Sequence, residues 1–179
     1  VLYVTLSAYL ADNARNLYYS NRYENDRQNV DFLSLREYVE TLRVPPGHPI
    51  TFRTFADWFR RHAHGSGLKD AHMVFEEFNG VLTGMTVDKA FLPLDEYMAL
   101  GVRQSIFSLD QRKRVYKVFQ RYREWLADNN WYDPNLVAFE YRHLCKPRYD
   151  FAVVDEVQDI TNVQLQLIVQ SLRKQENFV

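Results

Sequence analysis

The chain has little cysteine, no long apolar run and almost no net charge, and each shortage narrows the class of protein. Its single cysteine, Cys145, excludes an internal disulfide framework, and with only His143 as an evident partner we interpret it as structural. No apolar run approaches a membrane span and no signal pattern opens the chain, so we expect an intracellular protein, cytoplasmic or nuclear, without a membrane partner. The net charge of −1 over 179 residues leaves a nucleic-acid partner open, because a local basic stripe can bind one.

The sequence also lacks a phosphate-binding loop. Such a loop needs Gly-Lys-Ser/Thr at the start of a helix, so that backbone amides and the lysine meet the phosphates. In the nearest string, His64 to Lys69 (HGSGLK), Leu68 separates the glycine from the lysine, and we predict a flexible loop. A zinc site at His62 and His64 is not predicted either, because no cysteine or third ligand is in register with them.

The most informative stretch runs from Tyr149 to Gln164. Phe151 to Val154 is a continuous apolar run, typical of a strand buried on both faces of a parallel sheet. Asp155 and Glu156 follow at once, at the strand end where open α/β sheets bind ligands. One carboxylate there can hold Mg²⁺ through water, and the other can activate a water that attacks a phosphate. For an Asp-Glu pair alone, solvated side chains with no such role remain an open interpretation.

The longer string from Val154 to Asp159, VDEVQD, resembles motif II of the UvrD/Rep branch of superfamily 1 helicases. The resemblance implies that Asp155 holds Mg²⁺, that Glu156 activates the attacking water, and that Gln158 and Asp159 couple the nucleotide site to neighbouring motifs. It implies ATP as the substrate. For the fold it implies α/β architecture: a partial RecA-like (P-loop NTPase) parallel sheet interrupted by a mostly α-helical insertion.

The opening segment LYVTLSAYLADNAR reads as a strand followed by a helix, with Ser7 as a suitable N-cap. It resembles motif Ia of the same family, which lies along single-stranded nucleic acid, and this implies that Thr5 and Ser7 donate hydrogen bonds to phosphates. Leu6 stands where the family commonly has an aromatic residue. Without the resemblance these residues are an ordinary strand and helix cap, and both interpretations stay open.

A second strand and helix follow, with the strand over Val30 to Leu35 and the helix over Arg36 to Leu42. Their position suits a degenerate motif Ic, which implies nucleic-acid contacts from Ser34 and Arg36. A rival placement of the motif lies farther along the chain, at Thr54 to Asp57.

Closely spaced prolines between Val44 and Pro49 mark the clearest boundary, because they cannot continue a helix. We therefore expect RecA-like parts at 1–43 and 148–179, around a helical insertion at 44–147. The second RecA-like part is expected to contain a helix from Asn162 to Lys174 and the start of another strand at Asn177.

Within the insertion, two amphipathic helices are prominent. One is expected from Ala71 to Leu82 with Glu76 and Glu77 facing outward. The longest starts at Ser108, ends at Asn129 and carries a basic face, for which tracking along a phosphate backbone and simple solvation are both open. The basic face comprises Arg112, Lys113, Lys117 and Arg121.

Together these patterns predict an excised central fragment of an ATP-dependent helicase or translocase. Its expected partner is single-stranded or partly duplex nucleic acid, DNA in preference to RNA, and the sequence indicates no particular protein partner. Without a phosphate-binding loop the isolated fragment is expected to be inactive. The alternative is a helicase-derived scaffold module that binds nucleic acid or protein without catalysis.

Overall fold

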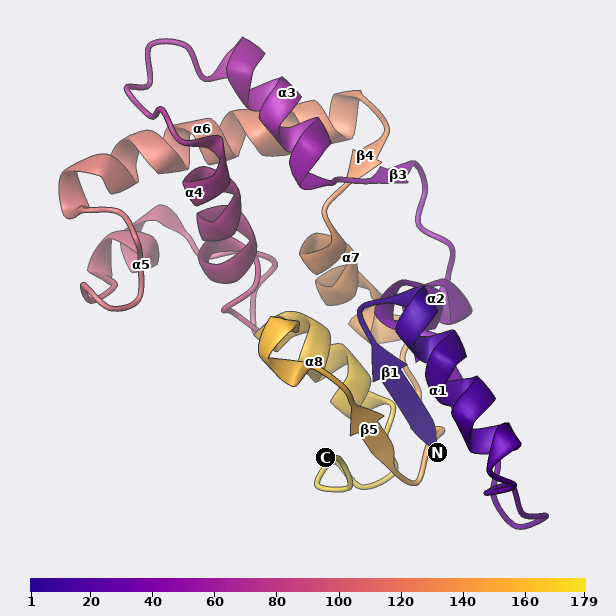
Figure 1. The fold of residues 1–179 in the computed structure, drawn as a ribbon. Coiled ribbons are helices and arrows are strands. Elements are labelled where there is room, and N and C mark those ends of the chain that lie inside the picture. Colours follow the sequence, from indigo (N-terminus) through magenta and orange to yellow (C-terminus); the bar gives the residue numbers. More distant parts are fainter. The chain divides into compact units, whose positions relative to one another are not determined.

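The computed structural model describes all 179 residues and has a mixed α/β fold that is 52% helical (Figure 1). The chain divides into two compact units. We call Val1–Val44 with Glu140–Val179 the sheet unit, and Pro45–Phe139 the helical unit. The chain leaves the sheet unit beside the proline-rich string and returns to it at Glu140, ahead of the predicted return at residue 148.

The sheet unit is built on three parallel strands in the order β2-β1-β5. Their bounds are β1 (Leu2–Thr5), β2 (Asp31–Ser34) and β5 (Ala152–Val154). A further stretch at the chain's end lies on the far side of β5, where the Ala152 amide donates to the Asn177 carbonyl (2.9 Å) and the Val154 amide to that of Val179 (2.7 Å). This pairing agrees with the strand expected from Asn177.

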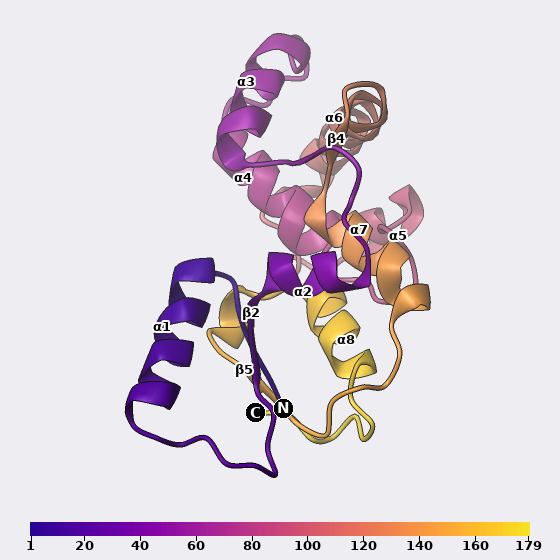
Figure 2. The same cartoon turned by 90° about the vertical axis from the view of Figure 1, so that its right-hand side faces the viewer.

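Helices cover both faces of this sheet (Figure 2). They are α1 (Ala8–Ser20) on one face, and α2 (Leu35–Leu42) and α8 (Asn162–Gln170) on the other. Arg15 of α1 donates to the Phe32 carbonyl (2.7 Å), and the Tyr38 hydroxyl of α2 donates to the Leu167 carbonyl of α8 (3.2 Å). The strands are therefore enclosed on both sides, as parallel sheets require.

Two elements of the sheet unit, strand β5 and helix α8, are shorter than the sequence predicted. Phe151 lies outside β5 and is 38% exposed, although its carbonyl still accepts from the Leu2 amide (2.9 Å). Helix α8 ends at Gln170 rather than Lys174, and the following Ser171 carbonyl accepts from the Arg148 and Tyr149 amides (2.7 and 3.0 Å). This pairing with the segment that leads into β5 replaces the last predicted turn.

The helical unit contains one short parallel strand pair, β3 with β4, and helices fill the chain between the two strands. Its elements are β3 (His48–Pro49), α3 (Phe52–His62), α4 (Ala71–Glu76), the π-helix η1 (Glu77–Leu82), α5 (Leu94–Ala99), α6 (Leu109–Asp128) and β4 (Trp131–Tyr132). Helix α7 (Pro134–Tyr141) leads back to the sheet unit, where the short 3-10 helices η2 (Arg142–Leu144) and η3 (Val157–Asp159) lie.

Large aromatic side chains form the core of the helical unit. Phe55, Trp58 and Phe59 of α3 are all buried, at the predicted i, i+3, i+4 spacing. Helix α6 spans the predicted range and opens with a capping box between Ser108 and Gln111. The Tyr122 ring of α6 packs edge-on against Phe55 at 5.5 Å between ring centroids, so α3 and α6 meet through their aromatic faces.

The predicted outward position of Glu77 is wrong. The regular helix stops at Glu76, and Glu77 opens the wider π-helical turn of η1 and is 1% exposed. Its carboxylate accepts from the Tyr97 hydroxyl (2.6 Å), the Ser105 hydroxyl and the Ile106 amide (3.2 Å). These donors satisfy a carboxylate that helical periodicity would place in solvent.

Candidate functional site

The carboxyl ends of β1 and β5 form the position in this sheet best suited to a ligand. From β1 the chain continues through α1 to β2 on one side, whereas from β5 it continues through α8 to Asn177–Val179 on the other. The order in which strands are added therefore reverses between the parallel strands β1 and β5, and open α/β sheets bind ligands outside the strand ends at such a switch point. Asp155 and Glu156 follow β5 at this edge.

Asp155 is held from two sides. Its amide donates to the Val4 carbonyl of β1 (2.9 Å), and its Oδ2 accepts from the Tyr3 hydroxyl (2.6 Å). Burial, and after it the hydrogen bond to the Asp155 carboxylate, raises the pKa of Tyr3 to about 12, so this hydroxyl remains a donor at neutral pH. Oδ1 of Asp155 forms no hydrogen bond within the chain, so one carboxylate oxygen can meet a ligand.

Glu156 adopts a backbone conformation that glutamate rarely takes. Its φ of 54° and ψ of 43° lie in the left-handed region, and its side chain is exposed. Such conformations cost about 1 kcal/mol or more and cluster at functional sites. Gln158 and Asp159 lie in the exposed turn η3 that follows, where the Asp159 amide donates to the Glu156 carbonyl (2.9 Å).

The oxygens at this edge fit the protein's share of a magnesium site. Mg²⁺ keeps several waters and is commonly bound by one or two carboxylates together with substrate phosphates. Asp155 offers one free oxygen and Glu156 an exposed carboxylate. The chain has no group of three or more His, Cys, Asp or Glu side chains that could hold a metal ion by itself. Waters, and substrate phosphates where they are present, would therefore complete the site.

The structure does not support nucleic-acid contacts at two of the residues predicted for them. Thr5 is 0% exposed and its hydroxyl has no hydrogen-bond partner. Ser34 is 3% exposed, and its hydroxyl is used in the capping box with Glu37 at the start of α2 (2.8 Å to Oε2). Burial excludes a ligand from both hydroxyls in this conformation.

The other two residues of the predicted strand-end contacts are accessible. Ser7 is half-buried and accepts from the Leu10 amide as the predicted N-cap of α1 (3.4 Å). Arg36 is exposed and pairs with Glu40 one turn along α2 (2.8 Å). An i,i+4 pair of this kind stabilises a helix, so a nucleic-acid contact at Arg36 would have to replace it. The rival Thr54 lies in α3 with its hydroxyl 3.1 Å from that of Thr51.

Arg112 is not part of a basic surface, and its prediction as a nucleic-acid contact is wrong. It is 3% exposed, and its guanidinium donates to backbone carbonyls on the segment before α6, the shortest bond reaching Leu100 (2.6 Å). The other acceptors are the carbonyls of Tyr97, Met98, Gly101 and Phe107. Arg112 therefore anchors the segment that enters the helix.

The remaining predicted cations of α6, Lys113, Lys117 and Arg121, are exposed. Arg121 donates to the His62 carbonyl at the end of α3 (3.4 Å), so this end lies beside α6. Further exposed cations lie on α6 or on the segments packed beside it: Arg61 at the end of α3, Lys69 in the following loop, and Arg114. The Arg114 guanidinium lies next to Gly67 of that loop.

We call these six cations the basic surface: Arg61, Lys69, Lys113, Arg114, Lys117 and Arg121. None of them forms an ion pair with an acidic side chain. Four of them lie on α6, and the other two, Arg61 and Lys69, lie on the end of α3 and its loop, which pack beside α6.

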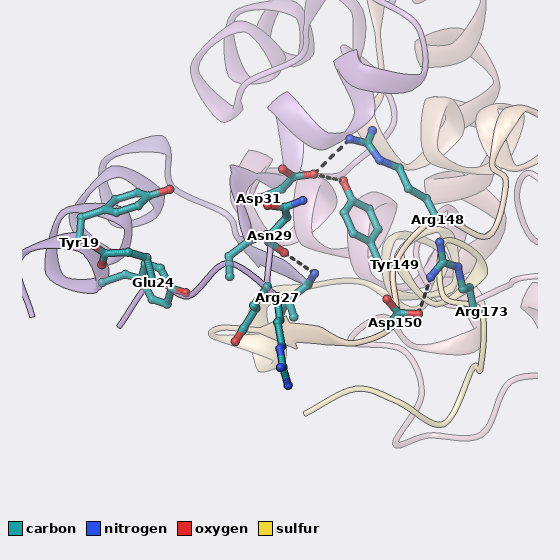
Figure 3. Close-up of a pocket in the computed structure, with 13 residues that line it drawn as sticks. Tyr19, Glu24, Arg27, Asn29, Asp31, Arg148, Tyr149, Asp150 and Arg173 are labelled. Carbon is teal, nitrogen blue, oxygen red and sulfur yellow. Dashed lines mark hydrogen bonds and ion pairs between the residues drawn. The ribbon is translucent and has the colours of Figure 1, made fainter. Parts of the chain in front are cut away.

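A polar hollow of about 570 Å³ lies at the opposite, amino end of the strands (Figure 3). Its charges mostly satisfy one another. Asp31 accepts from Arg148 (3.4 Å) and from the Tyr149 hydroxyl (2.7 Å), and Asp150 pairs with Arg173 (2.6 Å). We therefore do not assign a ligand to it.

No family model and no curated protein matches this chain. None of its helices is both long enough and apolar enough to cross a membrane.

Proposed function

We propose that this chain supplies the magnesium- and water-handling carboxylates of an ATP-dependent nucleic-acid helicase or translocase. The observation that carries the proposal is the position of Asp155 and Glu156 at the carboxyl end of β5, beside β1, at the point where the strand order reverses. The string VDEVQD and its resemblance to motif II support the same assignment.

In this function the free oxygen of Asp155 would hold Mg²⁺, and Glu156 would orient and deprotonate the water that attacks the γ-phosphate. The metal supplies charge neutralisation on the phosphates when bound. Gln158 and Asp159, exposed on η3, couple the site to neighbouring segments. The sheet unit is then part of a RecA-like domain, and the helical unit is an insertion within it.

The 179 residues contain no phosphate-binding loop, so we expect them to bind and hydrolyse ATP only with a segment that provides one. Purified alone, the chain should neither turn over ATP nor unwind DNA. In a longer chain with an intact Gly-Lys-Thr, Glu156→Gln should lower kcat by about 100-fold or more and leave the affinity for Mg-ATP nearly unchanged. Robust Glu156-dependent turnover by the 179 residues alone would refute the expected inactivity of the isolated chain. Full activity of Glu156→Gln in the longer chain would refute the proposal.

The second candidate is a scaffold module that binds nucleic acid without catalysis, for which the basic surface alone would suffice. Six exposed, unpaired cations on adjoining elements suit a phosphate backbone, whose counterions they would release. This binding does not depend on Asp155 or Glu156, so it can accompany either function. We expect DNA to be preferred over RNA, which parallel titrations with matched oligonucleotides would compare.

The basic surface is tested by oligonucleotide binding across a range of salt concentrations. Replacing Lys113, Lys117 and Arg121 with Ala should weaken binding and flatten the plot of log affinity against log salt by about 0.7 per lost contact on single strands. The matched control replaces Arg22, Lys146 and Lys174, three exposed cations of the sheet unit, and removes the same charge. Equal effects of the two triple variants would show that net charge matters and the surface does not.

A further inference from the structure

We propose that Tyr3 is a positioning residue for Asp155: its hydroxyl fixes one carboxylate oxygen and leaves the other turned to the ligand side of the strand ends. The inference rests on the function proposed above, because it assigns Asp155 a magnesium ion. Tyr3 carries no predicted role beyond its place in the strand from Leu2 to Thr5.

The sheet register makes this contact possible. Tyr3 pairs with Val153 in the β1–β5 ladder, and Asp155 lies two residues after Val153 in the chain. Side chains two residues apart in an extended strand share a face, and a long aromatic side chain reaches the diagonal neighbour on the next strand. The phenol of Tyr3 spans this diagonal, and its hydroxyl lies 2.6 Å from Oδ2 of Asp155.

Tyr3 is itself held in place. Its ring packs against Phe32 of β2 at 5.5 Å between centroids, and Phe32 in turn packs against Tyr18 of α1 at 5.4 Å. The backbone of Asp155 is fixed by its hydrogen bond to the Val4 carbonyl (2.9 Å). The carboxylate is therefore fixed through its amide and through one oxygen, and its free rotation is lost before any ligand arrives.

Such a hydrogen bond matters for a metal ligand at the end of a strand. Carboxylates that bind metals are commonly oriented by a neighbouring donor, and removing that donor typically lowers metal affinity by about 10- to 100-fold. The hydroxyl also occupies one of the two oxygens, so only one is offered to the water shell of the ion. A carboxylate without this restraint would sample several rotamers and hold the ion less well.

The chain offers a closely matched pair of variants. Tyr3→Phe removes the hydroxyl and keeps the ring packed against Phe32. Tyr18→Phe removes a hydroxyl from the other ring that contacts Phe32, but that hydroxyl is buried and has no hydrogen-bond partner. Any difference between the two variants therefore reports the bond to Asp155.

Two measurements on the purified 179-residue chain test the proposal. The first is metal-free: three-bond NMR couplings of the Asp155 side chain should report one χ1 rotamer in the wild type and in Tyr18→Phe, and averaged rotamers in Tyr3→Phe. The second uses Mn²⁺ as the probe and follows paramagnetic broadening of the Asp155 and Glu156 amide signals. Tyr3→Phe should shift this titration to roughly 10-fold higher Mn²⁺, and Asp155→Asn should abolish the broadening.

The outcomes separate this inference from the proposed function. An unchanged Asp155 rotamer in Tyr3→Phe, or equal Mn²⁺ titrations for Tyr3→Phe and Tyr18→Phe when Asp155→Asn abolishes broadening, would overturn the role of Tyr3 and leave the metal site intact. Broadening that is absent in the wild type or that survives in Asp155→Asn would instead count against the metal site, and the rotamer measurement would still decide whether Tyr3 positions the carboxylate.

Discussion

At the scale of single residues, the left-handed backbone of Glu156 predicts that glycine at this position gives a more stable chain than alanine. Glycine adopts a φ of 54° without the Cβ penalty, so Glu156→Gly should be more stable than Glu156→Ala by about 1 kcal/mol. Urea denaturation of the two variants would measure the difference. Gln158→Gly and Gln158→Ala in the same exposed turn form the control, since Gln158 has no positive φ and glycine should be the less stable residue there. If Gly and Ala are equally stable at residue 156, the strain is not present in solution.

Arg112 and Lys117 lie on one helix and should behave in opposite ways. Arg112→Ala leaves backbone carbonyls on the segment before α6 without their donor, so the free energy of unfolding should fall by roughly 3 kcal/mol. Lys117→Ala changes an exposed side chain and should shift it by at most about 0.5 kcal/mol. Urea melts give the first comparison, and oligonucleotide binding by the folded variants gives the second, in which only Lys117→Ala should weaken binding. A destabilised Lys117→Ala would contradict this division.

At the scale of elements, the closing strands of the helical unit depend on Gly47. Its φ is +88°, and a Cβ there would lie 2.2 Å from the Asn130 carbonyl oxygen, which accepts from the His48 amide (3.0 Å). Gly47→Ala should therefore cost at least about 2 kcal/mol in urea melts, because strain is joined by loss of the β3–β4 pairing. Gly65→Ala is the control: its φ is also positive, +77°, but nothing lies within 4 Å, and it should cost only about 1 kcal/mol. Equal costs at the two positions would exclude a clash at Gly47.

The elements also show what a sequence pattern can and cannot determine. The apolar spacing of Phe55, Trp58 and Phe59 and the cap at Ser108 depend on neighbours in the chain, and the sequence predicted them correctly. Asp155 and Glu156 follow the carboxyl end of strand β5, and the apolar run before them predicted this strand. Glu77 and Arg112 could not be placed in this way, because their partners lie on other segments and outweigh the periodicity of their own helices.

The basic surface and the contact between Tyr3 and Asp155 could not be predicted from the sequence either, for the same reason. Arg61 and Lys69 lie near the cations of α6 only because the end of α3 and its loop pack beside that helix. Tyr3 and Asp155 are 152 positions apart, and only the strand register joins them. A single sequence shows neither packing nor register, so the resemblance to motif II could indicate the carboxylates but not the residues that hold them.

At the scale of the whole molecule, buried tyrosines in both units predict a loss of stability at alkaline pH. Burial raises the pKa of Tyr38 and Tyr149 in the sheet unit and of Tyr97 and Tyr122 in the helical unit, and burial with the bond to Asp155 raises that of Tyr3 to about 12. The folded chain thus keeps protons that the unfolded chain, with tyrosine pKa values of about 10, releases. The stabilising contribution is complete below the unfolded pKa and is lost as pH rises through the folded values.

The urea midpoint should therefore fall as pH rises from about 10 towards about 12, and the absorbance of the buried tyrosines should rise together with unfolding. Tyr38→Phe removes one of these groups and should make the fall shallower for the sheet unit, whereas Tyr97→Phe should do so for the helical unit. Tyr9→Phe, at a tyrosine that is 74% exposed, is the matched control and should leave the slope unchanged. If Tyr38→Phe and Tyr97→Phe change one common transition, the two units unfold together; if each changes a separate transition, they unfold independently. A midpoint that stays constant over this range would contradict the burial of these hydroxyls.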